Sequence, residues 1–224
     1  MIVGRAIVRR FGRLIREAER QTTEAMREGR IETEPHVTDY FLGKVESTIK
    51  EHGKFDHIVF KPWYLRDRGP GSTEQEFGAD FCGVLDVRLR NFTHAKGFLS
   101  QAKMDGRGMS IELAIRGLTA VSVSQGQDSQ KLRNQIDKML KVTRESFVIV
   151  YSGERFVVVP ATSVKGLRGS GPVYGKPVDS FFKEFLMCFV GDPDLQAGDY
   201  NSLEKLRERT NSRTALMLQL VEKE

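Results

Sequence analysis

The chain has 224 residues, of which 39% are hydrophobic and 29% charged, with a formal net charge of +5. These values predict one soluble globular domain, and no apolar run is long enough to cross a bilayer, so membrane-spanning proteins are excluded. The excess of Lys and Arg favours a polyanionic partner. Cys82 and Cys188 are too few and too far apart for a disulfide framework or a zinc site. They predict buried free thiols in a cytoplasmic protein.

In chain order, apolar residues at helical spacing predict a basic amphipathic helix over residues 2–29. We expect this helix to pack on the core or on a second subunit; a transit peptide and direct DNA contact are the alternatives. A second helix is expected to start near Glu34 and Pro35 and to end near Gly53. A strand over residues 57–64 and a loop from residue 66 should follow.

The next two strands carry the polar residues of interest. Alternating apolar and polar residues predict half-buried strands over residues 80–90 and 97–104, joined through residues 91–94. When the two apolar faces are paired in a hairpin, Asp80 falls on the same side as Gln101 and Lys103. A register shifted by one residue would bury the polar set instead.

The second half of the chain is less regular. Glycines make residues 105–127 ambiguous, and the pattern then predicts a helix over 129–143 and strands over 146–151 and 155–160. Further on it predicts a buried helix over 178–190 and a final helix over 202–221. We therefore expect a mixed α/β (α+β) chain divided into an N-terminal arm (1–32), a core (33–165) and a C-terminal helical extension packed on the same domain (166–224).

A carboxylate, an amide and an amine on one strand face suit metal-dependent hydrolysis of phosphodiesters. Mg²⁺, for which Mn²⁺ can substitute, needs only one or two carboxylates and a backbone carbonyl besides water. Asp80, Gln101 and the carbonyl of Ala102 are the candidate ligands. Glu34 is a further candidate from the helix, with Glu32 or Glu46 as alternatives. The Lys103 ammonium is suited to hold the attacking water or the phosphate.

These residues resemble a known family. An early helical Glu, an Asp that opens a strand and Gln-x-Lys on the next strand resemble the PD-(D/E)xK nuclease superfamily. Gly78-Ala79-Asp80 followed by Gln101-Ala102-Lys103 is similar to its Mrr-type restriction endonuclease branch. The resemblance covers residues 33–160 and implies a restriction-endonuclease-like αβββαβ core with flanking N- and C-terminal helices. It implies Mg²⁺-dependent DNA cleavage, with Asp80 and Glu34 as metal ligands, Gln101 ligating or orienting water, and Lys103 acting on the nucleophile.

Candidate DNA contacts are Arg66, Arg68 and Arg88, expected around the site, and Gln135 on the following helix. We expect Asp86 to pair with Arg88 or Lys103 rather than to bind metal. A homodimer would supply the two sites that cutting both strands requires. By resemblance, the role lies in bacterial or phage defence, with a possible partner protein. Two alternatives stay open: a catalytically silent nucleic-acid-binding or assembly module, and a nuclease specific for RNA or junctions.

Overall fold

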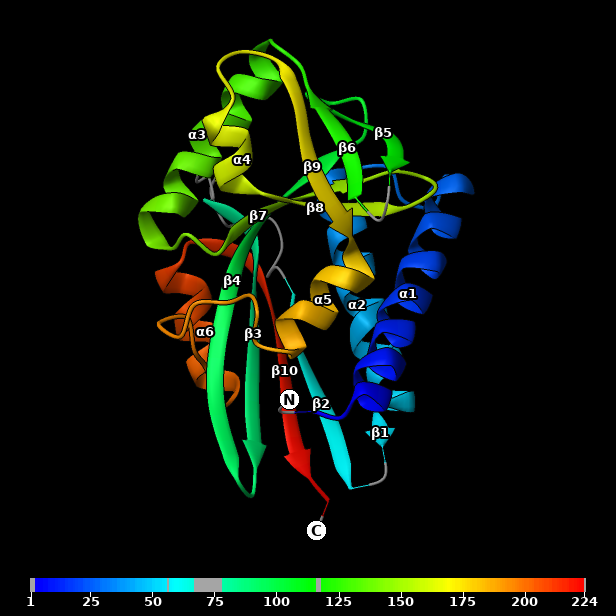
Figure 1. Cartoon of the computed structure of the whole chain (residues 1–224), viewed down its shortest axis with the longest axis vertical. Coiled ribbons are helices and arrows are strands. Elements are labelled where there is room, and N and C mark those ends of the chain that lie inside the picture. Colours follow the sequence, from blue (N-terminus) through cyan, green and yellow to red (C-terminus); the bar gives the residue numbers. More distant parts are fainter. Residues whose placement is uncertain (1–2, 56, 67–77, 116–117, 224) are drawn as a thin grey trace.

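The computed structural model describes residues 3–55, 57–66, 78–115 and 118–223, which form a mixed sheet of ten strands with helices on both faces (Figure 1). The helices are α1 (Arg5–Arg27), α2 (Glu34–His52), α3 (Gln127–Val142), α4 (Ala161–Gly166), α5 (Val178–Leu186) and α6 (Tyr200–Arg209). The strands are β1 (Lys54–Phe55), β2 (Ile58–Leu65), β3 (Ala79–Leu89), β4 (Phe92–Met104), β5 (Met109–Ile115), β6 (Leu118–Val123), β7 (Ser146–Tyr151), β8 (Phe156–Pro160), β9 (Gly171–Pro177) and β10 (Ser212–Glu222). Their order in the sheet is β1-β2-β10-β3-β4-β7-β8-β9-β6-β5. Among the described helices, none combines the length and apolarity needed to cross a membrane.

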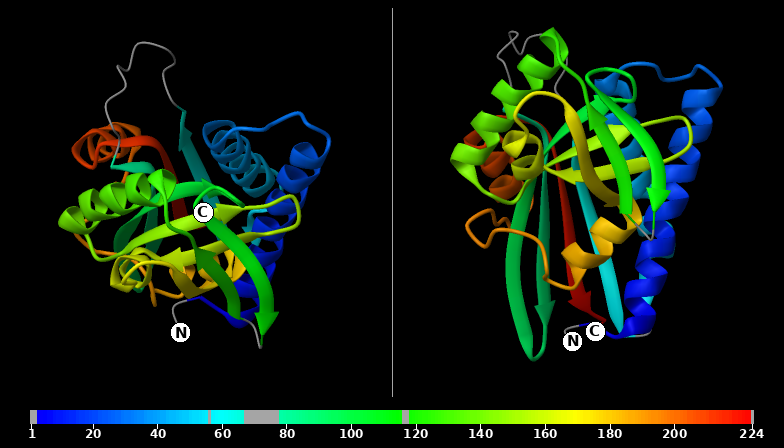
Figure 2. Two further views of the ribbon diagram at one scale, coloured as in Figure 1. Left: turned by 90° about the horizontal axis from the view of Figure 1, so that it is seen from above. Right: turned by 45° about the horizontal axis from the view of Figure 1, so that its top comes forward.

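Two hydrophobic cores lie on opposite faces of this sheet. Helices α1, α2 and α5 cover one face, and α3, α4 and α6 cover the other. Figure 2 shows α1 and α2 together on one side of the molecule, away from α3. The first core is rich in aromatic residues: the Phe98 ring lies 4.9 Å from the rings of both Phe181 and Phe185. Because both faces are covered, the central strands are buried on both sides.

The two N-terminal helices agree with the sequence. In α1 the predicted apolar stripe, including Ile7, Phe11 and Ile15, is buried against the core. Helix α2 begins at Glu34, with Pro35 in its first turn, and its last residue is His52. Pro is favoured there because the first amides of a helix have no intrahelical acceptor. The predicted position of Glu34 at the helix start is therefore confirmed.

The predicted hairpin is present, with two corrections. Strands β3 and β4 pair antiparallel with Cys82 opposite Leu99, but the turn consists of residues 90–91 rather than 91–94. Strand β3 is also buried on both faces rather than half-buried, because α6 and the segment before it cover its second face. Asp86 lies in this buried stretch, where the Arg88 guanidinium contacts it at 2.9 Å. Of the two partners expected for Asp86, the structure shows Arg88, while Lys103 pairs with Glu34.

The C-terminal segment differs most from expectation. The helix predicted over residues 202–221 ends at Arg209, and Asn211 adopts a left-handed backbone conformation with a φ of 49°. The chain then enters β10, which lies between β2 and β3, antiparallel to the first and parallel to the second. Residues 166–224 are therefore not a helical extension, since they supply a central strand of the sheet.

Other segments refine the prediction. The ambiguous region 105–127 contains the antiparallel pair β5 and β6, while α4 and β9 were not expected. Helix α5 ends at Leu186, four residues before the expected end. Both cysteines are free thiols; Cys82 is buried, but Cys188 is only half-buried rather than buried.

Candidate metal and phosphodiester site

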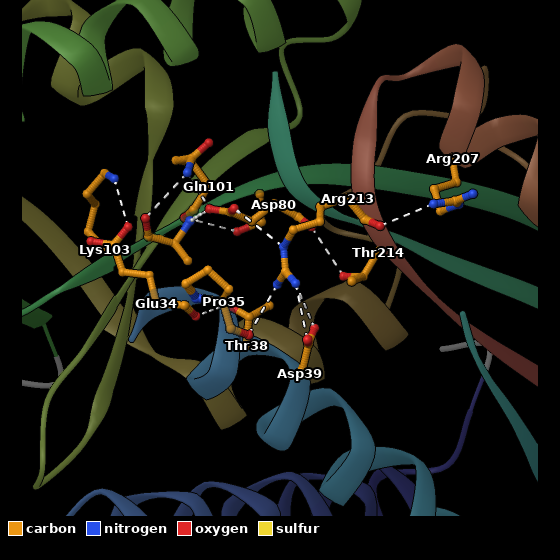
Figure 3. Close-up of polar contacts among 12 residues, drawn as sticks. Glu34, Pro35, Thr38, Asp39, Asp80, Gln101, Lys103, Arg207, Arg213 and Thr214 are labelled. Carbon is orange, nitrogen blue, oxygen red and sulfur yellow. Dashed lines mark hydrogen bonds and ion pairs between the residues drawn. The ribbon is translucent and has the colours of Figure 1, made fainter. Parts of the chain in front are cut away.

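The first residues of β3 and β10 and the last residues of β4 meet the start of α2 at one edge of the sheet, the edge formed by strand ends rather than by an outer strand. Because β3 and β4 are antiparallel, the first residues of β3 lie beside the last residues of β4. Strand β10 runs parallel to β3, so its first residues reach the same edge. Figure 3 shows the resulting cluster, in which Asp80, Gln101 and Lys103 lie near Glu34 and Arg213.

Asp80 extends the pairing of β3 and β4 beyond their ladder. The last paired residues at this end are Phe81 and Ser100, so the next backbone amide of β4 needs another acceptor. The Asp80 carboxylate accepts a hydrogen bond from the backbone N–H of Ala102 at 2.7 Å and another from the Gln101 side-chain amide. The predicted placement of Asp80 on the same side as Gln101 is confirmed by this contact.

Lys103 contacts Glu34 rather than Asp80. Its Nζ lies 3.0 Å from Glu34 Oε2, and the backbone N–H of Met104 donates to Glu34 Oε1 at 3.2 Å. The Lys103 side chain is only 9% exposed. Of the three acidic residues considered for the helix, Glu34 is the one that reaches this edge, since Glu32 is exposed and Glu46 contacts Lys50.

The sequence did not predict the guanidinium of Arg213 in this cluster. Arg213 Nη1 lies 3.1 Å from Asp39, its Nη2 donates to the carbonyl of Pro35 at 3.2 Å, and its Nε is 4.0 Å from Asp80 Oδ1. Asp39 also accepts a hydrogen bond from the Tyr64 hydroxyl at 2.9 Å. Arg213 was missed because residues 202–221 were assigned to a helix. Asn211, a residue type that often follows a helix end, was the signal for a new element.

Acidic and basic side chains lie next to one another in the site and shift each other's pKa values. Burial raises the pKa of the Asp80 carboxyl, while the hydrogen bond from Ala102 and the charges of Arg213 and Lys103 oppose that shift. Burial by itself would lower the pKa of Arg213, but Asp39 raises it above its ordinary value through a hydrogen bond and its charge. An added cation beside Asp80 would favour the ionised carboxylate that burial disfavours.

The donor set is compatible with Mg²⁺. The Oε1 atom of Gln101 is buried and has no hydrogen-bond partner among the described residues, and it belongs to the side chain that contacts Asp80. A buried acceptor without a partner is costly unless a cation or water satisfies it. The described residues contain no group of three or more His, Cys, Asp and Glu side chains that could hold a metal. The fit therefore rests on Asp80 and Gln101, with Glu34 bound to Lys103 in this structure.

Of the residues predicted to contact DNA that the structure describes, only Arg66 lies at this edge. Arg66 directly follows Leu65, which pairs with Ala215 near the start of β10, so the predicted position of Arg66 near the site agrees with the structure. It is exposed, and its guanidinium lies 5.8 Å from the Tyr64 ring centroid. Arg68 lies outside the described residues. Arg88 is eight residues further along β3 than Asp80, about 26 Å away in an extended strand, so it does not surround the site. Gln135 lies half-buried on α3, and no described hydrogen bond joins it to the cluster.

Comparison of the chain with known protein families, with curated proteins and with solved structures finds no match.

Proposed function

We propose that this protein is a Mg²⁺-dependent endonuclease that hydrolyses DNA phosphodiester bonds. The observation that carries the proposal is the contact of the Gln101 side-chain N–H with the Asp80 carboxylate, together with the buried Oε1 of the same amide, which has no hydrogen-bond partner among the described residues. Lys103 lies two residues after Gln101 on β4, and its ammonium contacts the Glu34 carboxylate. Carboxylate and amide oxygens are ligands that Mg²⁺ accepts, and a neighbouring ammonium suits a phosphate or an attacking water.

The order of elements supports the same proposal. Helix α2, strands β2, β3 and β4, helix α3 and strand β7 follow one another in the order of the αβββαβ core that the resemblance implies. The short strand β1 lies between α2 and β2, and β5 and β6 lie between β4 and α3. Strand β10 enters this core between β2 and β3. The added strand leaves β4 beside both β3 and β7, and so keeps the residues of the expected site next to one another.

Each residue has a distinct role in the proposed reaction. Asp80 and Gln101 would hold Mg²⁺, which when bound neutralises the charge that builds on the phosphorane and leaving oxygen. Glu34 fixes the Lys103 ammonium at the end of β4. From that position Lys103 would orient the attacking water or bind the scissile phosphate. Arg213 ties the first turn of α2 to β10, and so holds Glu34 in place relative to Asp80.

The first test measures plasmid cleavage with Mg²⁺ and with EDTA, and compares Lys103→Ala with the exposed-lysine control Lys205→Ala. We expect cleavage only with Mg²⁺ and a loss of at least about 100-fold in Lys103→Ala, because general acid–base and charge effects of this kind contribute about 10²- to 10⁴-fold. The control should cleave like the wild type. Full activity in Lys103→Ala, confirmed as folded by its cooperative melting transition, would refute the assignment.

Metal binding is measured separately through the melting temperature. A ligand that binds only the folded state at 100 times its Kd stabilises it by about 2.7 kcal/mol. We expect Mg²⁺ to raise the melting temperature of the wild type and of Lys103→Ala, but not of Asp80→Asn, which lacks the anionic ligand. DNA binding with no cleavage under any divalent metal would identify the catalytically silent module instead.

A further inference from the structure

A hollow of about 490 Å³ lies along the outer edge of β2, between α2 and the start of α6. We call it the edge groove, and it is lined by Glu46, Lys50, Phe60, Lys61, Pro62, Trp63, Tyr64 and Tyr200. Trp63 is 39% exposed and Tyr200 is 45% exposed, so both rings are accessible to a ligand. Exposed aromatic groups gathered in a hollow indicate a binding surface.

The edge groove is connected to the candidate site. Tyr64 lines the groove, and its hydroxyl donates a hydrogen bond to Asp39 at 2.9 Å. Asp39 contacts Arg213, whose Nε lies 4.0 Å from Asp80. A molecule that lies along the groove would therefore approach the residues that would hold the scissile phosphate.

The chemistry of the β2 edge decides against an added protein strand. Such a strand needs free backbone N–H groups on the edge that it joins. The outward N–H of Phe60 already bonds the carbonyl of Gly53 at 2.9 Å, and that of Tyr64 bonds Glu46 at 3.3 Å. Pro62, between them, has no N–H. The groove thus offers ring faces and few backbone donors.

The lining also carries two ammonium groups, Lys50 and Lys61, and one carboxylate, Glu46, with which Lys50 pairs at 2.9 Å, so the groove has a net positive charge. Aromatic faces with cations beside them are the features that bind the bases and phosphates of unpaired nucleic acid. Bases inside a duplex are stacked on one another and cannot cover these rings. We propose that the edge groove binds bases of an unpaired DNA strand next to the scissile phosphate. The substrate is then DNA with a single-stranded segment, an inference that rests on the proposed nuclease function.

Trp63 is the only tryptophan of the chain, so its fluorescence reports directly on the groove. The experiment titrates the full chain in EDTA, where metal-dependent cleavage does not occur, with a thymidine oligonucleotide. We expect the oligonucleotide to quench the Trp63 fluorescence, and a blunt duplex of the same length to quench it much less. No quenching by the oligonucleotide would overturn the proposal. Quenching by an RNA oligonucleotide but not by DNA would also overturn it, in favour of an RNA substrate.

Variants link this binding to cleavage. Tyr200→Ala should weaken binding of the oligonucleotide roughly tenfold, since a stacked base contributes about 1–3 kcal/mol, whereas Tyr174→Ala, which removes an exposed tyrosine on β9, should have no effect. With Mg²⁺, Tyr200→Ala should lose the preference for DNA with a single-stranded segment over blunt duplex. Cleavage with no such preference would refute the groove proposal alone. Quenching without cleavage would refute the nuclease proposal and leave the groove as a binding site.

Discussion

At the scale of single residues, the site places charges in a partly buried space and balances them in pairs. Lys103 faces Glu34, and Arg213 faces Asp39, while Asp80 receives hydrogen bonds from its neighbours on β4. Each contact reduces the cost of removing a charged group from water. The Gln101 oxygen stands apart from this pattern, because it has no partner among the described residues.

The pair of Arg213 and Asp39 should contribute measurably to stability. In Arg213→Ala, Asp39 keeps only the Tyr64 hydroxyl as a described partner, so we expect the free energy of unfolding to fall by about 2 kcal/mol. Urea denaturation of Arg213→Ala, Asp39→Ala and the double variant measures the coupling. The double variant should lose less than the sum of the two single losses. Strict additivity would show that the two side chains do not interact.

The raised pKa of Glu19, a residue of α1, predicts that the stability of the protein depends on pH. Burial raises its pKa to about 7, although it accepts a hydrogen bond from the backbone N–H of Phe156 at 2.6 Å. The ordinary value of 4.5 applies to the unfolded chain, so between pH 4.5 and 7 the folded state binds more protons. The free energy of unfolding should therefore fall as the pH rises through this window, by on the order of 3 kcal/mol in total.

Urea denaturation between pH 4 and 8 measures this effect in the wild type and in Glu19→Gln. The variant cannot ionise at this position, so its free energy of unfolding should change less with pH than that of the wild type. Other groups continue to titrate in both proteins. Equal slopes in the two proteins would contradict the assignment of a raised pKa to Glu19.

At the scale of elements, the hairpin of β3 and β4 holds the segment before α6 by a close backbone contact. Gly97 exchanges backbone hydrogen bonds of 2.9 and 2.7 Å with Asp192. A Cβ added at Gly97 would lie 2.5 Å from the carbonyl oxygen of Leu195 and 2.8 Å from that of Gly83. The small residue is therefore required for this contact, because backbone atoms cannot move aside as a flexible side chain can.

Replacement of this glycine should be destabilising. We expect Gly97→Ala to lower the free energy of unfolding by about 2 kcal/mol, in the range for overpacked interiors. Gly166→Ala is the matched control, since an added Cβ meets no atom within 4 Å there. That substitution should be neutral or slightly stabilising. Thermal melting compares the two variants. Equal melting temperatures of Gly97→Ala and Gly166→Ala would contradict the close contact.

At the scale of the whole molecule, the last strand of the chain completes the centre of the sheet. Strand β10 pairs with β2 on one side and with β3 on the other, and its Leu216, Leu218 and Leu220 are buried in the first core. The pairing of β2 with the rest of the sheet therefore runs through residues 212–222. Arg213 reaches the site only when this strand is in place.

A truncation tests this arrangement. Removal of residues 211–224 should abolish the cooperative unfolding transition, because it opens a gap between two central strands and exposes both cores. Removal of only residues 223–224, beyond the end of β10, should leave the transition nearly unchanged. Circular dichroism during heating measures both. A truncated protein that still melts cooperatively near the wild-type temperature would show that β10 is peripheral.

Local patterns were sufficient for several parts of the fold. The start of α2 at Glu34, the hairpin and the placement of Asp80 beside Gln101 followed from the proline, the alternation of residues and the pairing of apolar faces. Burial of the second face of β3 did not follow, because it depends on α6 and the segment before it, which lie more than 100 residues further along the chain. The positions of Asp80 and Gln101 relative to each other were thus predictable, whereas that of Arg213 was not.

By itself, the sequence determined which residues of the hairpin share a face, since side chains alternate in any strand and pairing the more apolar faces of the two strands fixes the register. The tertiary structure decided where residues 212–222 go. Their Leu, Met, Ala and Gln side chains favour a helix as readily as a buried strand, and only the space between β2 and β3 selects the strand. That choice brings Arg213 to Asp80 and Asp39, a long-range contact that no local pattern encodes.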